Sequence, residues 1–413
     1  MLNLNNNNFS QKAFIWLSFL MAFAIPLKRQ AIPPIVLLLF ISWLFESSFK
    51  QKWQNLKTNK NILIFISLYF VYLIGLLYSD NMSYGFIDVQ LKFPLLLFPI
   101  LYLSSESVKK TNFINFVLIA FILGNFIGTL ISIVHSFVLY SNSHDLFDFY
   151  YNTLAYFIHP SYYAIHLNFC IIALLWLILT KNDIILKFKK VAFILILFFS
   201  VFIVFLNSKI GILFLGIIYL YSIYYFIKLK KYFLSISLVL LIILSVFVIV
   251  RNFPGITNRI VSATEVLSKY NNIEKKSVDG TAERIMIWKT SIEIISDNLF
   301  FGVGTGDVKD ILLSKYKENN TQGAYEKKLN AHNQFLQTTI SLGLVGFIII
   351  IFMFIYPLIY SIKNKNLLYY YFILLVAMNF LVESMLETQT GVTFYAFFNT
   401  LLFFEISKNA KSV

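Results

Sequence analysis

A histidine at position 332 lies where a long polar segment meets an apolar run of membrane-spanning length. Asn333 follows it directly, and a short glycine-containing motif, residues 343–346, comes after nine further residues. An ionisable ring at the mouth of a membrane helix is costly to place, so it indicates a functional site. We therefore expect His332 to take part in chemistry. The alternative is a histidine solvated by lipid headgroups at a helix start.

The apolar run after His332 carries a polar stripe at offsets of three, four and seven residues: Gln334, Gln337, Thr338 and Ser341. This spacing places all four on one face of a helix. A polar face inside a membrane is expected to line a hydrated cavity rather than to contact lipid. The pattern predicts that Asn333 and Gln337 bind a substrate beside His332.

A second polar stripe lies near the outer end of the eleventh predicted helix, where Asn379, Glu383 and Glu387 recur every fourth residue. Residues at this spacing share one helix face. Carboxylates at such a depth face a cavity, pair with a cation or carry function. Glu383 is therefore a candidate counter-ion for Arg284 or an alternative general base, whereas exposure at the membrane interface explains Glu387 equally well.

The long polar region 251–331 contains regular patterns. Thr281 is a plausible N-cap, and the residues after it predict an amphipathic helix of about 16 residues with Arg284 in its first turn. Its apolar positions follow at helical spacing: Ile285, Trp288, Ile292 and Ile295. Such a helix could lie on the membrane surface or cover a cavity.

A glycine-rich turn, residues 302–306, precedes a second amphipathic helix that is predicted from Asp307 to about Tyr316. Backbone amides at such a turn can bind a phosphate, so Gly302 and Gly304 are candidate substrate-binding positions. Turn geometry alone is the commoner reason for glycines in loops. No Gly-Lys-Ser/Thr sequence follows and no strand–helix–strand pattern surrounds the turn, which excludes a nucleotide-binding fold.

Four side chains between the fifth and sixth predicted helices are of metal-ligand type: His144, Asp145, Asp148 and His159. Their spacing fits no strong metal-site template. The Asp-x-Asp pair with which many glycosyltransferases hold a metal does not occur in the sequence. We predict neither a metal nor another cofactor.

Composition defines the class of protein. The chain is 58% hydrophobic and 13% charged, with a mean hydropathy of +0.74, and its apolar runs are continuous rather than alternating, which favours membrane helices over a membrane barrel. We predict an all-α polytopic fold in one membrane domain, with spans 1–9 in residues 1–250, a large partly helical outer loop at 251–331, and three spans and a tail in 332–413. About twelve runs approach the roughly 20 apolar residues of a span: 13–27, 31–47, 61–78, 93–104, 112–139, 161–180, 189–207, 210–227, 232–250, 334–359, 367–382 and 390–406. The run at 93–104 is short enough to be a half-span, and we expect the first run to be retained rather than cleaved as a signal peptide.

The distribution of basic residues predicts the orientation of the chain. With the amino terminus in the cytoplasm, the inner segments hold 18 of the 34 lysines and arginines, as the positive-inside rule requires. The short outer segments hold four: Lys28, Arg29, Lys92 and Lys209. Residues 251–331 then lie outside. The net charge of +14 thus reflects membrane topology, and the chain carries no basic motif typical of nucleic-acid binding.

The spacing around His332 resembles the signature of the O-antigen ligase and polymerase family: His, then Asn, Ser or Gln, nine residues, Gly, two residues and a small residue. The order of Arg284, the glycine-rich turn and the His332 motif is similar to that family over roughly residues 155–400. His159 and Lys209 also match family positions. Two residues depart from the pattern, because the family usually has arginine at 209 and more often proline at 298, where this chain has Lys209 and Asn298.

The resemblance implies a bacterial inner-membrane enzyme with a periplasmic active site. Such an enzyme transfers a glycan from an undecaprenyl-diphosphate carrier, within the membrane lipids, to a glycolipid or glycan acceptor such as lipid A-core. Arg284 and Lys209 would stabilise the charge that builds on the departing phosphate. His332 would accept the proton of the acceptor hydroxyl or orient that hydroxyl.

Three function classes remain open from the sequence: an enzyme of the ligase or polymerase type, a secondary transporter or flippase, and a membrane scaffold. A ligase is favoured over a polymerase because one large outer loop precedes His332, whereas polymerases often divide these residues between two comparable loops. A secondary transporter or flippase would predict internal repeats and paired broken helices, and the sequence has neither. A membrane scaffold would need no histidine with nearby cations.

Overall fold

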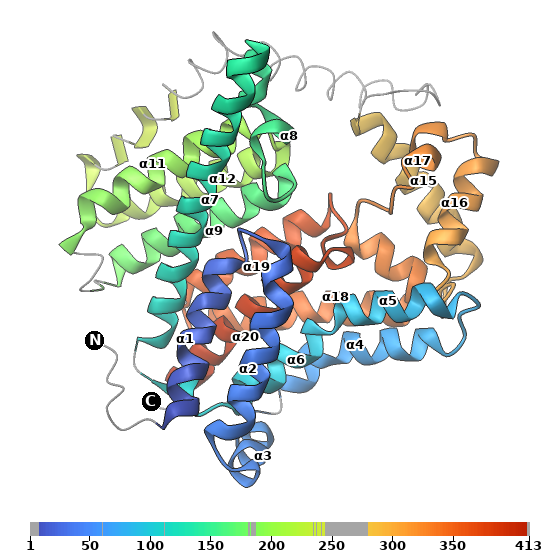
Figure 1. Cartoon of the computed structure of the whole chain (residues 1–413), viewed down its shortest axis with the longest axis horizontal. Helices are drawn as coiled ribbons and strands as arrows, with labels where there is room; N and C mark the ends of the chain where they lie inside the picture. Colours follow the sequence, from blue (N-terminus) through green and yellow to red (C-terminus); the bar gives the residue numbers. More distant parts are fainter. Residues whose placement is uncertain are drawn as a thin grey trace.

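The computed structural model describes residues 8–410, apart from 60, 111, 181, 183–186, 234, 237, 241 and 244–279 (Figure 1). The described residues form helices and turns without strands, which confirms the predicted all-α class. The helices are α1 (Phe9–Ala24), α2 (Ile32–Glu46), α3 (Phe49–Thr58), α4 (Ile62–Leu76), α5 (Met82–Lys92), α6 (Pro94–Ser104), α7 (Phe113–Ser143), α8 (Tyr151–Leu154), α9 (Pro160–Leu179), α11 (Lys189–Phe205), α12 (Lys209–Lys228), α15 (Gly280–Asp297), α16 (Val308–Glu318), α17 (Gln322–Glu326), α18 (Gln334–Lys363), α19 (Leu367–Phe380) and α20 (Gln389–Ala410).

Several helices have the length and composition of membrane spans. Within the described residues there are six: Arg29–Glu46, Met82–Ser104, Phe113–Ser143, Pro160–Leu179, Lys209–Lys228 and Gln334–Lys363. A seventh follows if α3 and α4, which meet at an angle of 98°, are one bent span; α1 and α19 are apolar but shorter. The predicted span 232–250 lies partly outside the described residues, as does the boundary at 250/251. The count of twelve spans and the orientation stay predictions.

One predicted outer segment is a helix instead. Residues 82–92, assigned to a short loop with Lys92 outside, form α5, which continues into α6 as an apolar stretch of 23 residues. Pro94 stands at the first turn of α6, where the missing amide hydrogen costs little. Lys92 is fully buried rather than exposed. The sequence analysis assigned Lys92 to a short outer segment without its ion pair with Asp88, which lies one helical turn earlier.

Aromatic rings fill the centre of the bundle. The Phe398 ring of α20 contacts Phe121 of α7 and Phe169 of α9, with ring centroids 4.7 and 4.8 Å apart in edge-to-face geometry. Such pairs add directional contacts to the burial of large apolar surfaces. Helix α9 also packs on α11 and α19, and α18 packs on α4 and α19. These contacts bring the ends of α9, α18 and α19 together.

Helices α15, α16 and α17 lie together at one edge of the molecule (orange in Figure 1). They share an apolar cluster with α18 in which Ile287, Ile294 and Leu312 are buried. The predicted apolar face of α15 was therefore partly wrong. Ile292 is 58% exposed, because the helix is rotated so that Ile287 and Ile294 point inward.

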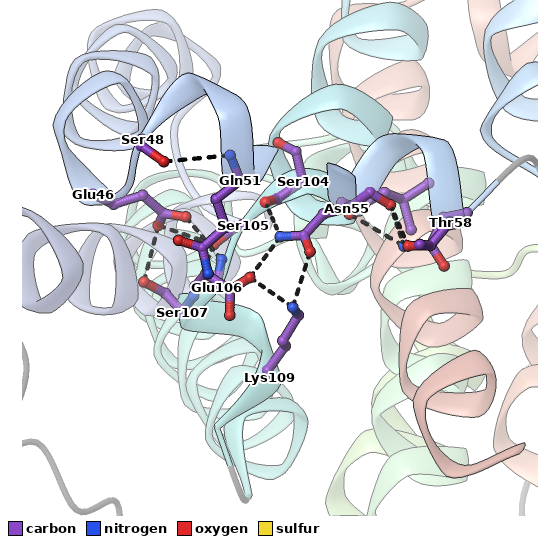
Figure 2. A network of polar contacts seen from close by, with 12 residues as sticks. Glu46, Ser48, Gln51, Asn55, Thr58, Ser104, Ser105, Glu106, Ser107 and Lys109 are labelled. Atoms are coloured by element: carbon purple, nitrogen blue, oxygen red, sulfur yellow. Dashed lines mark hydrogen bonds and ion pairs between the residues drawn. The ribbon is translucent and has the colours of Figure 1, made fainter. Parts of the chain in front are cut away.

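A polar cluster surrounds the last residue of α2 (Figure 2), next to α3 at the bottom of Figure 1. Glu46 is 1% exposed. Its carboxylate accepts three hydrogen bonds of 2.9 Å, from the Ser105 and Ser107 hydroxyls and the Glu106 amide. We call this group the Glu46 cluster, together with two residues that contact the Glu106 carboxylate: Asn55 at 2.7 Å and Lys109 at 2.6 Å.

Candidate active site

The three predicted catalytic residues meet in one place. Glu383 lies in the loop between α19 and α20 and is 4% exposed. One of its carboxylate oxygens is 2.7 Å from an Arg284 guanidinium nitrogen of α15, and the other is 3.3 Å from Nδ1 of His332. We call these residues the Glu383 site. Their chain separation is large, since Glu383 is 99 residues from Arg284 and 51 from His332.

The charge of Glu383 follows from its surroundings. Burial alone would raise its pKa, but the hydrogen bond with His332 and the charge of Arg284 prevail, so the pKa of Glu383 lies below its ordinary value. A carboxylate with a lowered pKa is a poor proton acceptor. Glu383 is therefore better suited to hold Arg284 and His332 than to act as the general base.

The contact with Glu383 also determines what His332 can do. When Nδ1 carries the hydrogen and donates it to a carboxylate, Nε2 is left with a lone pair that can accept a proton. The ring keeps access to solvent, with 24% of the side chain exposed. This arrangement matches the orientation of a general base by a buried anion.

The backbone at His332 is unusual, with φ at 44° in the left-handed region. A non-glycine residue adopts this conformation only where its surroundings enforce it. The Ala331 amide donates to the Gln337 side chain at 3.0 Å, and the His332 amide donates to the Asn330 side chain at 3.0 Å. The side-chain oxygen of Asn333 accepts from the Leu336 amide at 3.0 Å and so caps α18. Asn333 and Gln337, predicted to bind substrate, thus hold the turn that presents His332.

The polar stripe of α18 faces protein, as its burial shows. Gln334 and Thr338 are fully buried, and Thr338 is 3.1 Å from the Tyr72 hydroxyl of α4. A polar cavity of about 10 Å³ lies beside Gln337 and Ser341. This volume suits about one water molecule, so the cavity is smaller than a glycan would need.

Two further predicted ligands lie at neighbouring helix starts. His159 immediately precedes α9, and its pKa is lowered, mainly by burial. The charge of Glu383 raises this pKa, whereas the charges of Arg284 and His332 lower it. His159 thus interacts electrostatically with all three residues of the Glu383 site. Lys209 is the exposed first residue of α12, whose first turn packs on α9 through a 3.0 Å hydrogen bond from Asn168 to the carbonyl of Gly211.

The glycine-rich turn has a different use from the predicted one. The amides of Gly302, Val303 and Gly304 donate to carbonyls of the protein at 2.8 to 3.0 Å, two of them in α18. A Cβ at Gly302, where φ is +71°, would lie 2.5 Å from the Ile340 carbonyl oxygen. The turn is therefore packed against α18 at its break at Gly343. This corrects the prediction that the amides of Gly302 and Gly304 are free to bind a phosphate.

The carboxylates of the acidic loop before α9 accept hydrogen bonds from residues close to them in the chain. Asp145 accepts from the Phe147 amide at 2.9 Å, and Asp148 accepts from the Ser143 hydroxyl. Across the described ranges, no three histidine, cysteine, aspartate or glutamate side chains gather as metal ligands. Both aspartates shape the loop.

Sequence reasoning missed a second charged group next to the Glu383 site. Lys92 lies 3.0 Å from Glu387, whose side chain is only 11% exposed, so interfacial exposure of Glu387 was the wrong reading. Helix α19 ends at Phe380, and Glu383 and Glu387 therefore lie in a loop rather than on one helix face with Asn379. The Asp-to-Lys spacing of four residues was the available signal.

The fold and the site together define a multi-pass membrane protein with a paired carboxylate, arginine and histidine at the ends of its helices. A family model described as O-antigen ligase matches residues 192–351, a segment that contains Lys209, Arg284 and His332. This match supports the resemblance to an O-antigen ligase-like family that the signature around His332 predicts. This family consists of glycosyltransferase-like enzymes, so the match supports a ligase- or polymerase-type activity. No curated protein matches the chain.

Proposed function

We propose that this protein is an O-antigen ligase-type glycosyltransferase of the bacterial inner membrane. It moves a glycan from an undecaprenyl-diphosphate carrier to lipid A-core or a similar acceptor at the periplasmic face. The observation that carries the proposal is the buried carboxylate of Glu383, which holds a cation and an imidazole from two distant segments in one site. Phosphate departure needs the first and hydroxyl attack needs the second.

The chemistry follows from the positions of the two side chains. The acceptor hydroxyl oxygen forms a bond to the anomeric carbon, and the bond from that carbon to the diphosphate breaks. The hydroxyl proton passes to Nε2 of His332, and the undecaprenyl diphosphate leaves as an anion. A guanidinium has five N–H donors, so Arg284 can keep its contact with Glu383 and also bind the leaving phosphate. Lys209 and His159 are further candidates for binding that anion.

The ligase is preferred to the polymerase because of where the residues of the site lie along the chain. His332 ends the longest polar region, and three helices, α18, α19 and α20, follow it. The competing loop between α7 and α9 is only residues 144–159. A single large loop before His332 fits a ligase.

The glycan profile of a deletion strain tests this choice. A ligase deletion should leave polymerised glycan on its lipid carrier and remove it from the acceptor. An acceptor that carries a single repeat unit would instead identify the protein as the polymerase. Unlinked glycan that fails to appear on the outer face would favour a flippase.

A further inference from the structure

A chain of buried charges lies behind the Glu383 site. Lys92 of α5 is fully buried, yet its ammonium contacts Asp88 one turn earlier and Glu387 at 3.0 Å. The ring of Tyr72 lies 4.6 Å from the same ammonium. A buried ammonium is stable only when it is paired. These contacts therefore allow Lys92 to lie inside the bundle.

Glu387 belongs to the same short loop as Glu383. The loop, residues 381–388, contains one turn of 3-10 helix, η5 (Met385–Glu387), which begins two residues after Glu383 and ends at Glu387. Glu383 faces the arginine and the histidine, and Glu387 faces Lys92. One end of the loop thus meets the reaction site and the other end meets a buried cation of α5.

The first residues of α18 and its N-cap form hydrogen bonds with the same loop. The Gln334 side chain accepts a 2.6 Å hydrogen bond from the Leu386 amide and donates a 3.3 Å bond to Glu387. The Asn333 amide donates to the Ser384 hydroxyl at 3.3 Å. The ion pair between Glu387 and Lys92 connects the same loop to a second helix, α5.

We propose that Lys92 is a positioning residue: through Glu387 it holds loop 381–388 in the conformation in which Glu383 meets Arg284 and His332. Without the ammonium, the Glu387 carboxylate is a buried charge without a cation. Moving this carboxylate toward water lowers the free energy, so the loop shifts. That movement displaces Glu383, four residues earlier. The kinetic part of the test rests on the proposed function.

Two variants remove the ion pair in different ways. Lys92→Met keeps an unbranched side chain of similar length without charge. Glu387→Gln keeps an oxygen for Gln334 and leaves the Asp88–Lys92 pair intact, so it serves if Lys92→Met fails to fold. Glu46→Gln is the matched control, because it damages an equally buried carboxylate cluster around the last residue of α2.

Transfer kinetics per folded enzyme give the first readout. Lys92→Met and Glu387→Gln should lower kcat about 100-fold, the effect of displacing a catalytic group by about 1 Å. In a Glu383→Gln background, Lys92→Met should lower kcat by less than about 3-fold, since effects of residues that act as a unit do not add. Glu46→Gln should leave kcat unchanged. An equal loss from Lys92→Met in both backgrounds would reduce Lys92 to a structural residue.

Cysteine protection gives a readout that needs no transferase activity. Cys170 is the sole cysteine, and Met385 is fully buried in the loop, so Met385→Cys in a Cys170→Ser chain reports whether the loop stays closed. The thiol should resist maleimide in the parent and with Glu46→Gln, and should react at least about 10-fold faster with Lys92→Met, as local opening predicts. Equal protection in all three overturns the proposal. A parent without transferase activity but with Lys92-dependent protection would refute the proposed function alone.

Discussion

The Glu46 cluster and the Glu383 site each bury a carboxylate, but they satisfy it differently. Glu46 accepts its hydrogen bonds from two hydroxyls and an amide of the adjacent turn, residues 105–107 (Figure 2). Glu383 is paired with a guanidinium and an imidazole that remain partly open to solvent. Neutral donors from one turn complete a structural site. Titratable partners from distant segments leave charge and a proton acceptor available for chemistry.

The largest expected difference between the two regions comes from Arg284→Ala. This change removes the phosphate ligand and leaves Glu383 with His332 as its one remaining ionic partner among the described residues. We expect kcat/KM for the lipid-linked donor to fall by about 100-fold or more, as for the loss of a fixed charge at a leaving group. Lys109→Ala, which breaks the 2.6 Å ion pair of the Glu46 cluster, should change it by less than about 3-fold, since exposed pairs contribute little. Equal losses of kcat/KM in Arg284→Ala and Lys109→Ala would show that Arg284 has no specific role in the transfer.

Glu383→Gln should sharpen the comparison through its dependence on pH. The pKa of Glu383 is lowered in the folded protein, so its stabilising charge is fully present above the ordinary value of 4.5 and is lost as the pH falls through the lower, folded value. The stability advantage of the parent over Glu383→Gln should therefore be present at pH 7 and shrink below about pH 4.5. Thermal unfolding in detergent at several pH values measures it. An advantage that grows on acidification would contradict the assigned charge.

Lys209→Arg should have the smallest effect. The family usually has arginine at this position, and a guanidinium contacts a phosphate through two parallel N–H groups where an ammonium is a point charge. Activity should be retained or rise, by no more than about 10-fold for one improved charge-assisted contact. A large loss, measured in the same transfer assay, would contradict the proposed contact between residue 209 and the donor phosphate.

Local patterns predicted His332, Arg284 and Glu383, because a charge or an imidazole beside an apolar run is visible in the sequence. They also predicted Glu383 as a candidate counter-ion for Arg284. They did not predict its contact with His332, since that depends on how α18 and α19 pack. The glycine-rich turn was misread for the same reason. The acceptors of the Val303 and Gly304 amides are carbonyls of α18, and only the folded structure brings that helix next to the turn.

Lys92 is a residue whose role the local sequence patterns did not predict. The sequence analysis assigned it to a short outer segment because it lies between the predicted spans 61–78 and 93–104. The structure buries it with Asp88 and with Glu387, which lies 295 residues away in the chain. A pairing over that distance leaves no local periodicity in one sequence, whereas the four-residue spacing of Asp88 and Lys92 does.

The most direct test of the account is transfer by purified protein in detergent, with lipid-linked donor, acceptor and excess EDTA. The parent chain and Glu46→Gln should both form product without a metal or an ion gradient. His332→Ala should remain folded and lose about 100-fold or more of the rate, the usual contribution of a general base. Product at the parental rate from His332→Ala would contradict the central claim that the Glu383 site performs the transfer.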